Sequence, residues 1–312
     1  MELIDKGSEA LIIEPSTVFE RLRTREEHLS YSKLRHLTSP VNFTLNLLSK
    51  KSPTAGMTFG SLVDCLITEE HKFDSRYFVL NFAITSDNQK KLIEKTLEGD
   101  KSLKITDRFR QAFDDTYKRG KAEDYAHVLQ YCQLLELGLT GISQDEYDKA
   151  KEVADNLKSQ PQIEDLLAQN DGLQKFLEFE YAGWKFRGVI DMLSCGNFYD
   201  FKYSSRFNPE TFHRDINDYG YDLQMAIYRK GLEITGYGDM MTKGFFIVFD
   251  GYKNFSVMEF GEDYQQYAER KLDVYIRRIE RIIKENAWFR SYDFFEPNRI
   301  IRKPSYVKGF SE

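Results

Sequence analysis

The stretch RGVIDMLSCGNFYDFKYS, residues 187–204, decides the fold. A Gly-Asn dipeptide at 196 and 197 separates two runs rich in Val, Ile, Leu, Phe and Tyr, and this pattern predicts a β-hairpin with a two-residue loop. With that loop, Asp191 faces Lys202 across the hairpin and Leu193 faces Asp200. Because side chains alternate along a strand, Asp191, Asp200 and Lys202 then share one face. The other face takes Tyr199, Phe201 and Tyr203.

Two carboxylates and a lysine on one hairpin face indicate a possible chemistry. Directly opposed side chains lie about 5 Å apart, and diagonal ones roughly 7–8 Å. Two carboxylates at the diagonal distance can share a divalent cation with the lysine beside it, which suits metal-assisted phosphodiester hydrolysis. A solvent-facing hairpin with an Asp–Lys salt bridge has the same pattern, and such exposed pairs contribute only about 0–1 kcal/mol. The hairpin alone leaves both interpretations open.

Composition favours a folded chain that would hold a metal through oxygen atoms. Hydrophobic residues make up 41% and aromatic residues 14% of the 312 residues, which is ample for a large core. No run approaches about 18 apolar residues and the first residues do not resemble a signal peptide, so we expect a cytoplasmic protein without a membrane span. The three cysteines are scattered and the five histidines lack zinc-ligand spacing. A bound metal would therefore be Mg²⁺ or Mn²⁺.

The charge distribution leaves room for a nucleic-acid partner. The net charge of −6 argues mildly against one, because phosphates attract Lys and Arg. However, a long helical pattern in the last third carries basic residues at offsets of seven, four and three, which places them on one face. They are Arg270, Arg277, Arg281 and Lys284. This stripe is either a DNA-binding surface or an ordinary solvated helix face.

The order of expected elements predicts an α/β fold with a mainly antiparallel start. Strands are expected at 176–181, 184–194, 198–204, 243–250 and 255–260, and helices at 32–37, 58–68 and 218–235. No linker divides the chain, so we expect one elaborated domain over residues 1–312. Its parts are a lead-in (1–57), a catalytic core (58–68 and 172–260), a largely helical insertion (69–171), and a basic helix with a tail (261–312).

Other polar residues are placed to join the hairpin carboxylates. Glu178 and Glu180 are two apart on the preceding strand, hence on one face, so either could reach the same metal. Gln224 and Tyr228 are four apart on a later helix and share a face, although such pairs are often simple surface hydrogen bonds. Asp64 lies in an otherwise apolar helix, where it would cap a neighbouring helix, pair with a base or act as a further metal ligand.

Three motifs in succession, GVID at 188–191, DFK at 200–202 and QxxxY at 224–228, resemble the PD-(D/E)XK nuclease superfamily. More narrowly, they resemble its RecB-like branch with a QxxxY helix. The segments SYSKLRHLTSPVNF, GMTFGSLVDCLITEEHKF and QDEYDKAKEVADNLKSQPQIEDLL are similar to phage and prophage exonucleases of the RecE type (exonuclease VIII). The resemblance extends from about residue 30 to the basic helix.

The resemblance implies a restriction-endonuclease-like core, that is, a central mixed sheet flanked by helices, with a helical insertion. It implies a Mg²⁺-dependent exonuclease (Mn²⁺ as an alternative) that degrades linear double-stranded DNA from its ends, usually 5′ to 3′. The single strands left behind would pass to a RecT-like annealing protein for recombination, and the enzyme would form a ring-shaped homo-oligomer. The alternatives are an endonuclease or repair nuclease acting on branched DNA, or a catalytically silent DNA-binding scaffold of the same fold.

The resemblance also implies roles for particular residues. Asp191, Asp200 and the backbone carbonyl of Phe201 would be metal ligands, and Lys202 would orient the attacking water. Gln224 and Tyr228 would brace the site. Asp64 stands where relatives commonly carry histidine, and aspartate can also bind a hard cation. Arg35 is the candidate for binding the 5′-phosphate.

Overall fold

The computed structural model describes residues 14–49, 53–238 and 243–297 and has at its centre a five-stranded sheet in the order β3-β4-β5-β6-β7. Only β5 and β6 pair in parallel, and the other neighbours are antiparallel. The strands are β3 (Asn170–Tyr181), β4 (Trp184–Ser194), β5 (Asn197–Tyr203), β6 (Lys243–Phe249) and β7 (Phe255–Phe260). The expected α/β class with a mixed sheet flanked by helices is confirmed.

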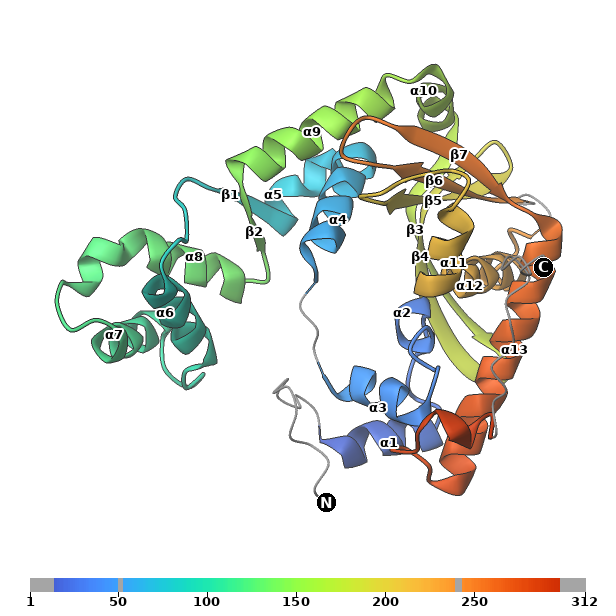
Figure 1. The fold of residues 1–312 in the computed structure, drawn as a ribbon, viewed down its shortest axis with the longest axis horizontal. Coiled ribbons are helices and arrows are strands. Elements are labelled where there is room, and N and C mark those ends of the chain that lie inside the picture. The colour runs from blue at the N-terminus through green and yellow to red at the C-terminus, as the bar shows by residue number, and fades with distance from the viewer. Residues whose placement is uncertain (1–13, 50–52, 239–242, 298–312) are drawn as a thin grey trace, which may run out of the picture.

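Helices cover both faces of this sheet (Figure 1). One face packs on α4 (Ala55–Thr68), α9 (Gln144–Lys158) and α10 (Pro161–Ala168). The other packs on α11 (Phe212–Tyr219), α12 (Tyr221–Ile234) and α13 (Glu262–Glu285) together with α1 (Pro15–Arg23), α2 (Tyr31–Leu34) and α3 (Pro40–Leu48). Two of these N-terminal helices, α1 and α3, fall in the lead-in (1–57), where the sequence predicted only a helix at 32–37.

The predicted loop of the β4–β5 hairpin is wrong by one residue. The turn residues are Cys195 and Gly196, with φ of 50° and 73°, and Ser194 pairs with Asn197. Two residues with positive φ are what a tight hairpin turn requires, and glycine adopts that conformation without strain. The pairing therefore shifts by two positions, which brings Asp191 across from Asp200 instead of Lys202.

The even shift leaves the predicted faces of β5 unchanged, because only an odd slip turns side chains over. The aromatic side chains of Tyr199, Phe201 and Tyr203 pack with the α4 and α9 layer. Phe198, on the opposite side, packs with the α12 layer, and Asp200 and Lys202 alternate with the aromatic residues in the same way.

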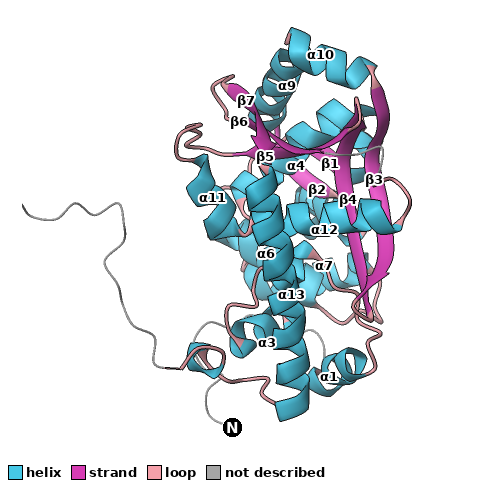
Figure 2. Ribbon diagram, turned by 90° about the vertical axis from the view of Figure 1, so that its right-hand side faces the viewer, coloured by secondary structure: helices cyan, strands magenta, loops and turns pink. Residues whose placement is uncertain are grey.

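The pairing between β4 and β5 stops partway along β4, which leaves a gap in the sheet. The β4–β5 ladder covers only Met192 to Ser194 on β4. Further along, the same edge pairs with the N-terminal segment, where the Leu29 amide donates to Lys185 and Arg187 donates to Leu29, at 2.8 and 3.0 Å. Figure 2 shows the long β3 and β4 continuing past the ends of the other strands. Residues 188–191 therefore have an edge that no strand covers in the described part of the chain.

Only part of the expected helical insertion (69–171) forms a lobe to one side of the sheet (Figure 1), since α9 and α10 from the same span pack on the sheet itself. The lobe contains α6 (Asp87–Glu98), α7 (Ile105–Thr116) and α8 (Ala126–Glu136), which bury their own apolar cluster. The lobe joins the body through a short parallel pair, β1 (Tyr77–Leu80) with β2 (Thr140–Ser143), which the sequence did not predict. The remaining short helical segments among the described residues are η1 (Glu70–Lys72), α5 (Phe73–Arg76), η2 (Ala122–Tyr125) and η3 (Tyr292–Phe294). No helix among the described residues is both long and apolar enough to cross a membrane.

Candidate active site

Four of the predicted residues meet at the gap in the sheet. Asp64 comes from α4, Asp191 from β4, and Asp200 with Lys202 from β5. Burial raises the pKa of each aspartate and the positive charge of Lys202 opposes that rise, so all three carboxylates lie near its ammonium group. The gap allows this meeting, because side chains from a helix above the sheet and from two separated strands reach the same place.

Asp200 is the most enclosed of these carboxylates, with 1% of its surface exposed. Its Oδ1 accepts a hydrogen bond of 2.9 Å from Gln224 Nε2, and its Oδ2 forms an ion pair with Lys202. Burial raises the pKa of Asp200 above its usual value, although Lys202 opposes that rise. The ion pair with Lys202 therefore favours the charged form of Asp200 against the effect of burial.

The carboxylate of Asp191 takes the place of a backbone hydrogen-bond acceptor for the amide of Phe201. Its Oδ2 accepts a 2.7 Å hydrogen bond from the amide of Phe201, next to the point where the β4–β5 ladder ends. Burial, and then the charges of Asp64 and Asp200, hold the pKa of Asp191 well above its usual range. Crowded carboxylates with raised pKa values are typical of functional sites, because folding alone gives no reason to gather like charges.

Lys202 is the cation of the cluster. Burial disfavours its charged form, but the charges of Asp200 and Asp191 outweigh burial and raise the pKa of the ammonium group. Its Nζ also lies 4.8 Å from the centre of the Tyr221 ring. Lys202 therefore stays protonated at neutral pH.

The two residues of the QxxxY motif hold the strands around the gap. Gln224 Nε2 donates to Tyr228 Oη at 2.7 Å as well as to Asp200, and the Tyr228 hydroxyl donates to the carbonyl of Val189. The tyrosine approaches so closely because residue 188 is glycine: a Cβ there would lie 3.1 Å from the Tyr228 ring. The motif thus ties α12 to both β4 and β5.

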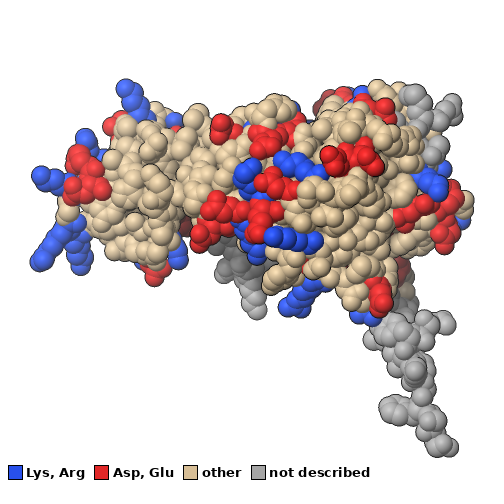
Figure 3. All heavy atoms as spheres, turned by 90° about the horizontal axis from the view of Figure 1, so that it is seen from above, with Lys and Arg blue, Asp and Glu red and all other residues tan. Residues whose placement is uncertain are grey.

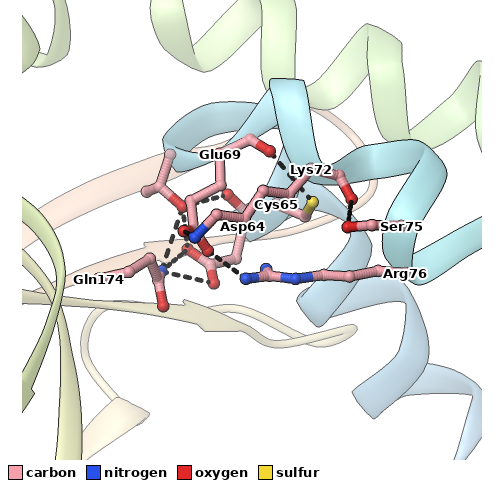
Figure 4. Close-up of polar contacts among 8 residues, drawn as sticks. Asp64, Cys65, Glu69, Lys72, Ser75, Arg76 and Gln174 are labelled. Carbon is pink, nitrogen blue, oxygen red and sulfur yellow. Dashed lines mark hydrogen bonds and ion pairs between the residues drawn. The ribbon is translucent and has the colours of Figure 1, made fainter. Parts of the chain in front are cut away.

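Asp64 is held by a residue that the sequence analysis did not identify. Gln174 of β3 donates from Nε2 to both carboxylate oxygens, at 3.2 and 3.1 Å, and to the hydroxyl oxygen of Thr68 at 3.1 Å (Figure 4). Burial and the charge of Asp200 raise the pKa of Asp64 to about 6. No motif in the sequence marks Gln174, because its partner is 110 residues away.

The N-terminal segment brings Arg35 towards the same region. Arg35 follows α2, and its Nη1 donates to the Tyr31 hydroxyl at 3.3 Å. Burial raises the pKa of Tyr31, while the charges of Lys202 and Arg35 lower it, so all three groups are neighbours. Arg35 is therefore placed where a cation could meet a substrate phosphate.

The structure does not bring the two predicted glutamates to the cluster. In the β3–β4 register, Gln174 falls opposite Asp191, so Glu178 lies four residues further along β3 and Glu180 six. At about 3.3 Å per residue these offsets are roughly 13 and 20 Å. Both side chains are exposed, and Glu178 Oε1 is 3.9 Å from His28 Nε2.

The basic stripe of α13 also lies away from the cluster. The helix packs on α12, which stands between it and the sheet (Figure 1). Arg281 forms an ion pair with Glu285 at 2.9 Å and lies 4.3 Å from the centre of the Phe294 ring. The other members of the stripe, Arg270, Arg277 and Lys284, are exposed on the same helix. Their role in DNA binding stays a prediction that this arrangement does not support.

The carboxylates fit a hard divalent cation by donor type, since such ions prefer oxygen ligands. Burial also leaves Gln224 Oε1 without a hydrogen-bond partner in the part of the chain that the structure describes, while Asp200 Oδ2 contacts Lys202 as an ion pair. Among the described residues, no three Asp, Glu, His or Cys side chains lie close enough together to hold a metal ion as they stand, and Asp200 forms an ion pair with Lys202. The carbonyl of Phe201 lies between Asp200 and Lys202, and its role as a ligand stays a prediction.

Comparisons with known proteins bear on the family and the fold of this chain. A family model described as a PDDEXK-like domain of unknown function (DUF3799) matches residues 30–291. The crystal structure of a "putative exonuclease" from Eubacterium rectale is similar in fold, with a TM-score of 0.50 and 14% sequence identity. The match covers 94% of this chain and 96% of that one. No curated protein matches the chain significantly.

Proposed function

Since the chain belongs to the PDDEXK-like family whose model matches residues 30–291, we propose that it is a metal-dependent exodeoxyribonuclease. It would degrade linear double-stranded DNA from its ends, in the 5′ to 3′ direction, and leave single strands for recombination. The observation that carries the proposal is the meeting of Asp64, Asp191, Asp200 and Lys202 at the gap in the sheet, with the QxxxY pair bracing it.

The chain's own residues suit phosphodiester hydrolysis. A divalent cation would supply charge neutralisation and a bound water of lowered pKa. Asp191 and Asp200 would hold that cation, with Asp64 as a third ligand. Lys202, which stays protonated, donates to phosphate oxygens and stabilises the negative charge of the transition state, but it cannot take the proton of the attacking water. Gln224 and Tyr228 hold the Asp200 carboxylate and the Val189 carbonyl of β4 in fixed positions relative to α12.

Surface charge bears on how DNA would be reached. On the face seen in Figure 3, Lys and Arg alternate with Asp and Glu, so that face has no continuous basic surface. In this proposal DNA approaches by the gap in the sheet, because Arg35 and Lys202 are neighbours there. Ring assembly and handover of the product to an annealing protein are part of the proposal and rest on the RecE-type resemblance.

The test compares linear and covalently closed duplex DNA in Mg²⁺ or Mn²⁺, with EDTA as the control. We expect only the linear DNA to be degraded. Labelled nucleotides should be released from 5′-labelled DNA earlier than from 3′-labelled DNA. Asp200→Asn should abolish release, because the amide keeps the size of the side chain but not its charge. Glu164→Gln, on an exposed residue of α10, should remain active. Cleavage of closed circles would replace the exonuclease with an endonuclease, and cleavage of neither substrate would indicate a silent scaffold.

A further inference from the structure

Gln174 combines an unusual backbone with an unusual set of contacts. Its φ is 49°, in the left-handed region that non-glycine residues rarely adopt, although it lies inside a twelve-residue strand. The register with β4 is the same on both sides, since Leu173 pairs with Met192 and Lys175 with Ile190. The residue is therefore not an insertion that shifts the pairing.

The local turn at this position sends the side chain towards α4. Gln174 Nε2 lies between the two oxygens of Asp64, at 3.2 and 3.1 Å, and donates to Thr68 Oγ1 at 3.1 Å. The Thr68 hydroxyl in turn donates to the main-chain carbonyl of Asp64 at 2.8 Å. Figure 4 shows this group joining the helix and the strand. Asp64 is therefore held through both its carboxylate and its main-chain carbonyl.

These contacts leave the two oxygens of Asp64 unequal. Oδ1 accepts from Gln174 and lies 3.4 Å from Thr68 Oγ1. Among the described residues, Oδ2 accepts from Gln174 alone, so its second lone pair is available to another ligand. A group that orients a metal ligand in this way typically changes metal affinity by about 10–100-fold when it is removed.

We propose that Gln174 is a positioning residue, whose amide fixes the carboxylate of Asp64 so that Oδ2 is presented to a divalent cation in the nuclease site. The role rests on the proposed function, because it assumes that Asp64 helps to hold the cation. The proposal concerns the side chain of Gln174 alone. The backbone turn has a separate structural effect, because it lets Leu173 pack with the α4 layer and Leu177 with the α12 layer.

The experiment measures Mn²⁺ affinity of the full chain by electron paramagnetic resonance, without DNA and without turnover. Gln174→Met keeps the length of the side chain and removes the amide. Gln174→Gly also removes the amide but accepts the left-handed backbone without strain. The matched control is Ala182→Gly, because Ala182 has φ of 50° at the far end of the same hairpin. We expect both Gln174 variants to weaken Mn²⁺ binding about 10–100-fold and the control to bind as the wild type does.

A double-mutant cycle with Asp64→Ala then asks whether Gln174 acts through Asp64. In the D64A background, Q174M should cause no further loss of affinity, because the group it orients is gone. Unchanged or tighter Mn²⁺ binding in Q174M and Q174G would overturn the proposal, as would additive losses in the cycle. Failure of both Gln174 variants to fold would assign the residue a structural role and overturn it as well. A wild-type chain that binds no Mn²⁺ would instead refute the proposed function on which it rests.

Discussion

Replacing Lys202 by methionine should destabilise the protein in a way that depends on pH. The side chain of Lys202 is 13% exposed and that of its partner Asp200 only 1%, so the pair is shielded from solvent. Methionine keeps the length of lysine and removes the charge, which leaves the Asp200 carboxylate buried without a cation. Removing one partner of a buried pair typically costs about 3–5 kcal/mol.

The size of the change in melting temperature follows from the chain length. Unfolding entropy is about 2.1 cal/mol/K per residue, or about 0.65 kcal/mol/K for 312 residues. A loss of about 3–5 kcal/mol therefore lowers the melting temperature by about 5–8 °C. This applies where Asp200 is ionised, at about pH 8.

Lower pH should restore part of this stability. The folded pKa of Asp200 is already raised by burial, and without Lys202 it rises further above the value in the unfolded chain. The folded state then binds more protons than the unfolded state, so stability is present at low pH and is lost as pH rises through the folded pKa. The loss grows by up to about 1.4 kcal/mol per pH unit.

The measurement is thermal unfolding followed by circular dichroism at pH 6 and pH 8, with EDTA present so that no cation replaces the lysine. The control is the double variant Asp200→Asn with Lys202→Met, which removes both charges and should regain most of the lost stability at pH 8. An unchanged melting temperature of K202M at pH 8, or an equal fall at both pH values, would refute the electrostatic account of the pair.

Three further outcomes follow from other parts of the structure. Tyr228→Phe removes a buried hydroxyl with two hydrogen-bond partners, so urea titration should show a loss of about 1–3 kcal/mol. Phe176 is 56% exposed on the strand that carries Gln174, where a base could stack on its ring. Phe176→Ala should weaken the binding of single-stranded DNA about 5–150-fold, as measured by fluorescence anisotropy. The control Phe289→Ala, at a residue that is 55% exposed elsewhere on the chain, should leave that binding unchanged. Iodoacetamide should label exposed Cys195 in the native protein and spare Cys132, whose burial raises its pKa to about 12; mass spectrometry showing early labelling of Cys132 would contradict that packing.

Sequence patterns predicted two of the strands completely. The strands at 184–194 and 255–260 agree residue for residue with β4 and β7. β4 alternates buried and exposed residues over its first part, which gives a period-two pattern, and β7 is a short, mostly apolar run bounded by Asn254 and Gly261. The start of β3 was missed: its first residues, Asn170 to Lys175, include a glycine and several polar side chains, which weaken the strand pattern. Pairing with β4, not local preference, makes that segment a strand.

The site was predicted where one hairpin or one helix supplies the residues. Asp191, Asp200 and Lys202 depend on alternation within a hairpin, and the error of two positions in its register left the shared face of Asp200 and Lys202 unaffected. Contacts between distant segments could not be predicted in this way. The meeting of Gln174 with Asp64, and of Arg35 with Tyr31 near Lys202, depends on how α4 and α2 pack on the sheet, which a single sequence does not encode locally.

The position of the site in the gap of the sheet has a physical reason. A continuous β4–β5 ladder would use the Phe201 amide for backbone pairing, and Asp191 would then have no donor for its buried carboxylate. Because the ladder ends at Met192 and Tyr199, the α4 layer can supply Asp64 from one face while the α12 layer supplies Gln224 from the other. The cost is a set of buried carboxylates whose pKa values all rise, chiefly because burial disfavours their charged forms. Repulsion between neighbouring carboxylates adds to the rise for Asp64 and Asp191. A bound divalent cation would relieve that repulsion, so metal binding and the stability of this part of the fold should be coupled.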